Sequence, residues 1–290
     1  MSTPDPGTGP VQVLAQVLSS KRVGGHRHLT LVAPGVAERF RPGTAVALRH
    51  PGDGSGSVLR RTLPIFTARP IGAYGGTIEL ALPGGHEFDD LGALPAGSTL
   101  DLVGPVGRPF ALPKEPVATT LVGDGVDAAP LFPLAARLRE RGCEVHVLLG
   151  AATETGLFGV LEARRAAKTV TVCTQDGSVG IRGGAGDVLP DLLRRTGTDV
   201  VYAAGPPAVL HRVAAAAEDH GAWSQALVMV AMPCGTGACG GCVVPVVGED
   251  GLTRMVRGCA EGPVFRGDRV RWRDLARVPA DAWGAQGATR

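Results

Sequence analysis

The chain contains the run Met232-Pro233-Cys234-Gly235-Thr236-Gly237-Ala238-Cys239-Gly240-Gly241-Cys242, and a further cysteine, Cys259, follows it. Four and then two residues separate the first three cysteines, and sixteen residues lie between the third and the fourth. The glycines of the run permit a tight loop whose backbone N–H groups turn toward one point. After the run, residues 243–247, a Gly-containing turn and residues 252–257 predict a β-hairpin, in which Pro245 is suited to an edge strand. The hairpin returns Cys259 to the mouth of the loop, so that four thiols converge.

Four thiolates at this spacing are a ligand set for a plant-type [2Fe–2S] cluster, because three ligands come from one loop and the fourth from a later segment. Zinc is one competing interpretation, but structural zinc sites usually take cysteines in C-x2-C pairs, and the second pair is missing here. Disulfides are the other interpretation, and they need an oxidising compartment, which no other feature of the sequence indicates. We therefore expect Cys234, Cys239, Cys242 and Cys259 to bind a [2Fe–2S] cluster, with zinc and disulfides as the alternatives.

The composition is that of a globular protein and gives no sign of a nucleic-acid partner. The 290 residues are 44% hydrophobic, carry a formal net charge of +2 and include 4% aromatic residues, which is little positive charge for phosphates and few rings for base stacking. Residues 1–10 lack the pattern of a signal peptide, and no apolar run approaches the roughly eighteen residues of a membrane span. We expect a cytoplasmic protein with no membrane association, whose other cysteines, Cys143 and Cys173, are core residues.

Three successive patterns predict a multi-domain fold: a β-barrel, an α/β domain with a parallel sheet, and a small C-terminal [2Fe–2S] cluster module. Residues 11–113 contain short β-type runs punctuated by Gly and Pro, which predict a flavin-reductase-like barrel. Residues 114–228 alternate strands with helices, which predicts βαβ units of a nucleotide-binding type. Residues 229–283 form the cluster module, and we expect disordered ends at 1–10 and 284–290.

The elements expected within these domains follow from the same patterns. The barrel strands are expected at 11–15, 28–32, 45–49, 58–66, 77–82 and 99–103. In the α/β domain, strands are expected at 117–122, 144–149, 169–173, 199–204 and 226–230, and helices at 128–142, 157–167, 187–195 and 207–220. Parallel sheets bind ligands beyond the carboxyl ends of their strands. The turns that begin at Gly123 and Gly205 lie at such ends.

In the order and content of its parts the chain resembles the electron-transfer subunit of class 1B dihydroorotate dehydrogenase, a branch of the ferredoxin–NADP reductase superfamily. The resemblance runs from about Val11 to Trp272 and is most specific in the cluster module. There the chain reads Cys-Gly-x-Gly-Ala-Cys-x-x-Cys-Val from Cys234, and Gly-Cys-x-x-Gly-Pro-Val-Phe from Gly258. The resemblance implies that barrel and α/β domain hold FAD, that NADH reduces it, and that electrons pass through the cluster to an FMN-containing catalytic subunit in a heterotetramer.

The flavin-binding segments depart from that family. Its Arg-Pro-x-Ser segment reads Arg61-Thr62-Leu63-Pro64 here, so Arg61 remains to meet a phosphate, whereas Pro64 supplies neither a hydroxyl nor an N–H group. Its Gly-x-Gly-Thr/Ser loop falls at Gly85-His86-Glu87-Phe88, where a carboxylate would face two phosphates, although Gly84-Gly85 could still form a phosphate turn. The resemblance thus assigns Arg61, Thr62, Leu63, Gly84 and Gly85 to FAD, and the substitutions leave FAD binding open.

The nucleotide-binding turns also depart from the family's pattern, in ways that disfavour a bound phosphate. The family's Gly-Gly-Gly-x-Gly-x-x-Pro turn reads Gly123-Asp124-Gly125-Val126-Asp127-Ala128-Ala129-Pro130, and its Cys-Gly-Pro reads Ala204-Gly205-Pro206. A helix N-terminus attracts a phosphate, but we expect Asp127 to cap this helix and occupy its amides itself. Gly123, Gly125 and Gly205 keep the resemblance to a nucleotide site. The substitutions nevertheless argue against NAD(P) and predict weak or absent FAD and no robust NADH oxidation by this chain alone.

The leading hypothesis is an iron–sulfur electron-transfer subunit that relays electrons between FAD or NAD(P)H, where retained, and an FMN-containing, dihydroorotate-dehydrogenase-like catalytic subunit. One alternative is a non-enzymatic iron–sulfur scaffold or redox sensor on a decayed reductase fold, and another is a self-contained NAD(P)H-dependent reductase. A basic run lies beside the module, and it predicts either a solvated face or a docking surface for an acidic partner. Its members are Arg266, Arg269, Arg271, Arg273 and Arg277.

Overall fold

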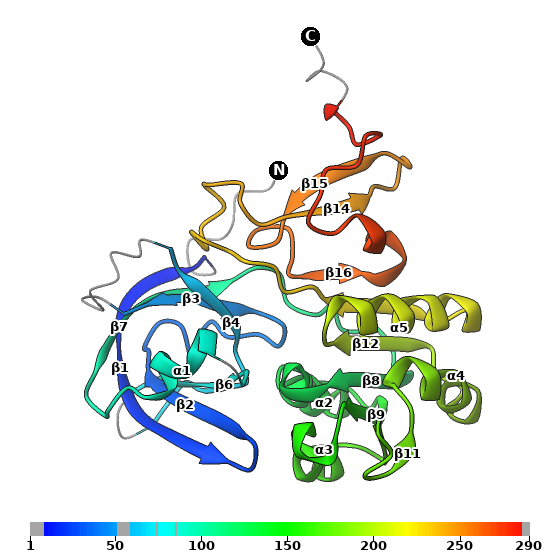
Figure 1. The fold of residues 1–290 in the computed structure, drawn as a ribbon, viewed down its shortest axis with the longest axis horizontal. Helices are drawn as coiled ribbons and strands as arrows, with labels where there is room; N and C mark the ends of the chain where they lie inside the picture. The colour runs from blue at the N-terminus through cyan, green and yellow to red at the C-terminus, as the bar shows by residue number, and fades with distance from the viewer. Residues whose placement is uncertain (1–8, 51–58, 73–74, 85, 286–290) are drawn as a thin grey trace.

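The computed structural model describes residues 9–50, 59–72, 75–84 and 86–285, which fold into three parts (Figure 1). The barrel and the α/β domain lie side by side, and the module with the cysteines lies across one end of both. Backbone hydrogen bonds join the module to each neighbour, from the Arg60 N–H to the Pro233 carbonyl on the barrel side and from the Val228 N–H to the Pro263 carbonyl on the other. The cysteine loop is therefore held by both larger parts.

The barrel is an antiparallel sheet in the order β4-β3-β7-β1-β2-β6-β5, curved around an apolar core. Leu31, Leu48 and Leu80 belong to this core and are fully buried. The short helix α1 lies in the same part. The bounds are β1 Val11–Val23, β2 His26–Val32, β3 Ala45–Arg49, β4 Arg61–Pro64, β5 Thr67–Arg69, β6 Thr77–Leu82, α1 His86–Gly92 and β7 Thr99–Val106. The barrel predicted from the sequence is confirmed, in a half-open form.

The α/β domain is a sheet in the order β11-β10-β9-β8-β12-β13-β16, parallel except for β16. Helices α2 and α3 pack on one face and α4 and α5 on the other. The chain proceeds from β8 outward to β11 and then returns to β12, so the topological switch point lies between β8 and β12. The bounds are β8 Ala118–Asp124, η1 Gly125–Ala128, α2 Leu131–Glu140, β9 Glu144–Ala151, η2 Glu154–Gly156, α3 Val160–Ala166, β10 Thr169–Thr174, β11 Ile181–Arg182, α4 Ala185–Thr196, β12 Val200–Ala204, α5 Pro207–His220 and β13 Trp223–Leu227.

The module consists of the cysteine loop, a two-stranded hairpin and a return segment. The hairpin pairs β14 (Val243–Val247) with β15 (Thr253–Arg257), as the sequence predicts, and Pro245 lies in this isolated pair. Beyond Cys259, β16 (Val264–Arg266) leaves the module and pairs antiparallel with β13. The 3-10 turns η3 (Gly267–Arg269) and η4 (Trp272–Asp274) follow. The return segment thus extends the sheet of the α/β domain.

Some predicted boundaries differ from the structure for local reasons. The last parallel strand was expected at 226–230 but runs from Trp223 to Leu227, because the chain after it turns toward the cysteine loop. The helix expected from 128 begins at Leu131, because residues 125–128 form the separate 3-10 turn η1. Part of the strand expected at 58–66, residue 58, lies outside the described residues. Cys143 and Cys173 are buried in the α/β core, which confirms the prediction made for them.

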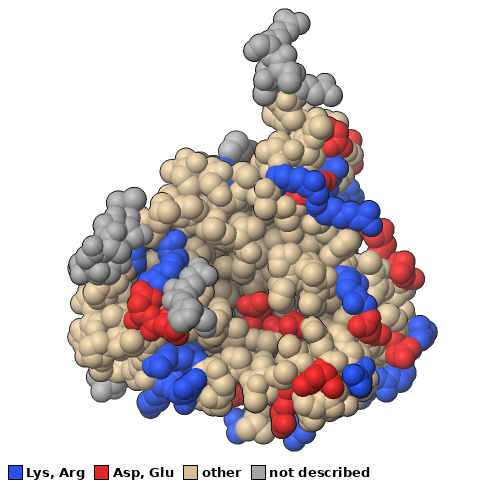
Figure 2. All heavy atoms as spheres, viewed as in Figure 1, with Lys and Arg blue, Asp and Glu red and all other residues tan. Residues whose placement is uncertain are grey.

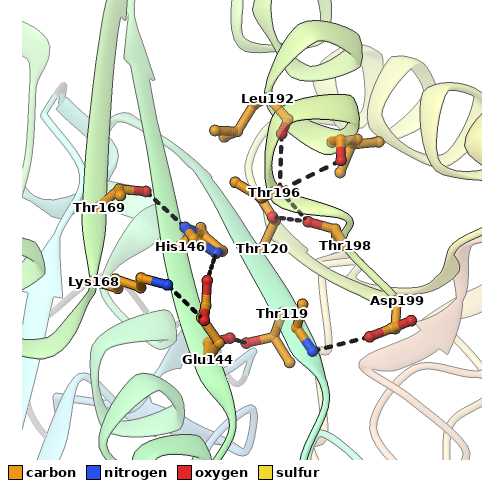
Figure 3. A network of polar contacts seen from close by, with 12 residues as sticks. Thr119, Thr120, Glu144, His146, Lys168, Thr169, Leu192, Thr196, Thr198 and Asp199 are labelled. Atoms are coloured by element: carbon orange, nitrogen blue, oxygen red, sulfur yellow. Dashed lines mark hydrogen bonds and ion pairs between the residues drawn. The ribbon is translucent and has the colours of Figure 1, made fainter.

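A polar network ties together the amino ends of the parallel strands (Figure 3). The buried imidazole of His146 contacts the Thr169 hydroxyl through Nδ1 at 2.7 Å and the Glu144 carboxylate through Nε2 at 2.9 Å. On the neighbouring strand, the hydroxyls of Thr120 and Thr198 lie 2.6 Å apart. These contacts satisfy buried polar groups. They lie at the amino ends of the strands, whereas parallel sheets bind ligands at the carboxyl ends, so we infer that the network stabilises the fold.

Candidate functional site

The cysteine loop, residues 234–242, packs against the outer wall of the barrel. Gly235 has a φ of +69°, and a Cβ atom at this position would lie 2.5 Å from the Cβ of Ala47 on β3. Only glycine permits both this conformation and this approach. Within the loop, Cys239 is exposed, Cys234 is half-buried and Cys242 is buried, and Cys259, which follows the hairpin, is also buried. The site therefore has an outer and an inner pair of thiols.

The sulfur atoms are arranged in two pairs. The Sγ atoms of Cys242 and Cys259 lie 3.4 Å apart, and Cys239 lies close enough to Cys234 to lower the pKa of its thiol. Within the described part of the chain, no three His, Cys, Asp or Glu side chains gather closely enough to hold one metal ion. A single zinc ion would draw all four thiolates to one centre, whereas a two-iron cluster spreads four cysteines over two irons. The paired arrangement fits a [2Fe–2S] cluster better than zinc.

Backbone amides are directed at the outer sulfurs. The Thr236 N–H donates to Cys234 Sγ at 3.4 Å, and the Gly241 N–H donates to Cys239 Sγ at 3.3 Å. Burial opposes ionisation of Cys234, but hydrogen bonds from Thr236 and Cys239 outweigh it and lower the pKa of this thiol to about 5. In the inner pair, burial and the hydrogen bond with Cys242 raise the pKa of Cys259 to about 12. Cys234 is therefore a thiolate at neutral pH, whereas Cys259 loses its proton when a metal ion binds.

Arg257, the last residue of β15, holds the loop from below. Its Nη1 donates to the Gly237 carbonyl at 2.9 Å, and its Nη2 pairs with Glu261 Oε1 at 2.7 Å. Glu261 also accepts the Arg257 backbone N–H at 2.9 Å. The sequence reasoning missed this pair, although the Arg-to-Glu spacing of four residues next to the fourth cysteine was a visible signal. Arg257 places a positive charge beside the sulfurs and fixes the curvature of the loop.

The residues assigned to FAD by resemblance do not form an open phosphate cradle in the described chain. The Arg61 guanidinium makes a two-pronged ion pair with the Asp90 carboxylate at 2.6 and 2.7 Å. The Thr62 hydroxyl donates to the Met232 carbonyl at 3.3 Å, and the Leu63 side chain is buried in the barrel core. Gly84 is exposed, and Gly85 lies outside the described residues. A flavin pyrophosphate at this place would have to displace Asp90 from Arg61.

Residues 86–88 of the phosphate loop expected at 85–88 begin α1, a short helix, instead of forming an open loop. The physical reason lies in the sequence that follows, because Phe88 and Leu91 pack against the barrel core and draw the segment into a helix. Asp90 on this helix is then within reach of Arg61, which the sequence alone did not reveal.

The three glycines assigned to the nucleotide lie at the carboxyl edge of the parallel sheet, near the switch point. Gly123 ends the buried part of β8, Gly125 begins η1 with a φ of +56°, and Gly205 follows β12. The expectation that Asp127 caps the following helix was wrong. Asp127 lies inside η1, and α2 starts after Pro130, which provides no side-chain cap. The carboxylates of Asp124 and Asp127 are instead half-buried at the edge itself.

The basic run beside the module is partly neutralised within the chain. Arg266 pairs with Asp268 at 2.7 Å, and Arg271 pairs with Asp274 at 2.8 Å and with Asp281 at 2.5 Å. Asp268, Asp274 and Asp281 therefore offset part of the positive charge of the five arginines. Among the described residues, no helix is long and apolar enough to span a membrane.

Comparison with known proteins agrees with this geometry. A family model described as the iron-sulfur cluster binding domain of dihydroorotate dehydrogenase B matches residues 230–271, which contain all four candidate cysteine ligands. A protein of Thermotoga maritima, named dihydroorotate dehydrogenase B (NAD(+)), electron transfer subunit homolog, is 32% identical over 247 residues, which is 84% of this chain and 83% of that protein. The electron transfer subunit of Desulforamulus reducens is 29% identical over 245 residues, 83% of this chain and 90% of its own length.

Solved structures carry the same architecture. The structure of an NADH-dependent reduced ferredoxin-NADP oxidoreductase, described for flavin-based electron bifurcation, has a TM-score of 0.78 and 28% identity, and the match covers 91% of each chain. The Amycolatopsis cytochrome P450 reductase GcoB shares the fold at a TM-score of 0.57 and 22% identity, over 73% of this chain and 66% of that one. With its reductase fold and its iron–sulfur cluster binding domain, the chain belongs to the family of dihydroorotate dehydrogenase B electron transfer subunits.

Proposed function

We propose that this chain relays electrons through a [2Fe–2S] cluster bound by Cys234, Cys239, Cys242 and Cys259. The match of residues 230–271 to an iron-sulfur cluster binding domain carries the proposal, because all four cysteines lie inside it at the spacing of a two-iron cluster. When bound, the cluster supplies reversible one-electron transfer, which none of the protein side chains here provides. The chain's own residues bind the irons, exclude water from the inner pair and aim amide dipoles at the outer pair.

The exposure of the outer cysteines indicates where electrons leave or enter. Cys239 and the neighbouring Gly240 and Gly241 are exposed, so a redox partner can approach that side of the site. The inner pair faces Met229, Val230 and Met232, which separate it from solvent. We infer that the partner docks over the outer side of the loop, with the barrel and the α/β domain behind it.

The partner proposed is an FMN-containing catalytic subunit of the dihydroorotate dehydrogenase type. The relatives are named as electron transfer subunits, and such a subunit requires a second protein on which the reaction takes place. The arrangement expected from the resemblance is a heterotetramer. FAD in the barrel is a further part of the proposal, with the condition that its pyrophosphate competes with Asp90 for Arg61.

Co-expression with an FMN-containing, dihydroorotate-dehydrogenase-like protein tests the relay. The two chains should co-elute from a sizing column, and substrate added to the complex without oxygen should bleach the visible absorption of the cluster and produce a reduced-state EPR signal. If this chain elutes alone and the partner's substrate never reduces the cluster, the relay is wrong and the scaffold or sensor hypothesis replaces it. Zinc in place of iron in protein purified without oxygen would contradict the cluster itself.

A further inference from the structure

The crevice at the switch point of an open parallel sheet is the place where such domains bind nucleotides, because the strand ends diverge there and helix N-termini face the ligand. In this chain the crevice lies beyond the ends of β8 and β12. Figure 2 shows a hollow between the barrel and the α/β domain with acidic side chains on its floor. The residues at the end of β8 therefore decide which ligands the crevice accepts.

The side chain of Asp124 fills the space at this crevice. A Cβ atom on Gly205, after β12, would lie 3.1 Å from the Cβ of Asp124, and a Cβ atom on Gly150, in β9, would lie 3.1 Å from its Oδ2. The two glycines on either side of β8 thus make room for a carboxylate of the chain itself. The cradle that glycines provide for a pyrophosphate in dinucleotide-binding turns is occupied here by Asp124.

A second carboxylate, that of Asp127, lies close to the first. Burial and the charge of Asp124 raise the pKa of Asp127 to about 6, which is still below neutral pH, and burial also raises the pKa of Asp124. Among the described residues, neither carboxylate has a cation or a hydrogen-bond donor that lowers its pKa. An anion entering the crevice would meet two uncompensated negative charges in a half-buried place, where repulsion is stronger than in water.

Two backbone amides at the junction of η1 and α2 are also engaged. The Ala129 N–H donates to the Val126 carbonyl at 3.1 Å, and the Phe132 N–H donates to the Ala129 carbonyl at 3.3 Å. These bonds belong to η1 and to its junction with α2. The N–H groups of Ala129 and Phe132 are therefore not available to a phosphate, which leaves the choice of ligand to the side chains of Asp124 and Asp127.

We propose that Asp124 and Asp127 close the switch-point crevice to dinucleotide phosphates, so that NAD(P)H is not a redox substrate of this chain. This inference rests on the proposed function and adds the route of the electrons to it. The electrons enter and leave through proteins that dock at the cysteine module. Asp124 acts by filling the cradle and by its charge, and Asp127 acts by its charge.

Calorimetric titration of the purified, cluster-containing full chain with NADH and with NADPH tests the exclusion. The unaltered chain should show no saturable binding at millimolar nucleotide. Asp124→Gly combined with Asp127→Asn should show saturable binding, with a Kd about tenfold or more below the highest nucleotide concentration tested. The matched control is Glu115→Gln combined with Glu249→Gln, which changes the net charge equally at two exposed positions and should leave binding absent.

Two outcomes would overturn the proposal. One is tight NADH binding by the unaltered chain, and the other is equal binding by the double variant and the control when circular dichroism shows both to be folded. Asp127→Asn alone, which keeps the shape of the side chain, provides a milder variant if the double variant does not fold. The titration uses neither the catalytic partner nor reduction of the cluster, so its result stands apart from the outcome of the co-expression test.

Discussion

Replacing Asp127 by Asn tests whether the ionised carboxylate of Asp127 at the crevice lowers the free energy of unfolding. Burial and the neighbouring charge of Asp124 raise the pKa of Asp127 from 3.8 to about 6. A carboxyl whose pKa is higher in the folded than in the unfolded chain stabilises the fold below pH 3.8, and this contribution is lost as the pH rises through about 6. The rise is about two pH units, and at about 1.4 kcal/mol for each unit the ionised carboxylate destabilises the native state by up to about 3 kcal/mol.

Asp127→Asn should therefore raise the free energy of unfolding at about pH 8 by up to about 3 kcal/mol and leave it nearly unchanged at about pH 4, where the native carboxyl is already neutral. Urea unfolding followed by tryptophan fluorescence measures the difference, because Trp223 lies at the start of β13 in the same sheet. Glu115→Gln, at an exposed position, is the control and should change stability little at either pH. Equal effects of Asp127→Asn at both pH values, or lower stability at about pH 8, would refute the reasoning.

Three further substitutions test the site. Cys239→Ser should abolish or bleach the visible cluster absorption and lower the bound iron, whereas Cys173→Ser, in the core of the α/β domain, should retain both. Arg257→Gln should weaken the loop by about 1 kcal/mol and speed the loss of cluster absorbance under a chelator, while Arg254→Gln, which breaks a similar pair at the far end of the hairpin, should not. Asp90→Asn should raise the flavin retained on purification several-fold by freeing Arg61, and unchanged flavin content would show that the Arg61 pair does not limit FAD binding.

The sequence predicted the elements whose signals are local. The hairpin β14–β15 follows from two β-type runs around a glycine turn, and α5 matches the predicted range from Pro207 to His220 because Pro in the first turn and Gly221 at the end mark both boundaries. The parallel sheet followed from the alternation of strands and helices. For the cysteines, the spacing alone indicated which residues would gather in one module.

The features that the sequence did not reveal depend on contacts between distant segments. The pairing of Arg61 with Asp90 requires that residues 86–92 become a helix beside β4, and the apolar contacts that cause this come from the folded barrel. Asp127 has the residue type and position of a helix cap, and only the 3-10 turn between β8 and α2 removes it from that role. In both cases tertiary packing overrides a local preference, at the segments where ligand-binding motifs depart from the family.

If Asp124 and Asp127 exclude nucleotide phosphates as proposed, the reductase fold still has a physical use. The hairpin β14–β15 is a sheet of two strands, which is marginally stable by itself. The rest of the module is supported from outside: β16 pairs with β13 of the α/β sheet, and the cysteine loop lies against β3 of the barrel with Gly235 at the contact. The Arg108 N–H bonds the Gly262 carbonyl next to the fourth cysteine segment. Because both domains fix the module, its four cysteine sulfurs can keep their paired arrangement, and the fold retains a function as a support for the cluster site even if its nucleotide crevice is closed.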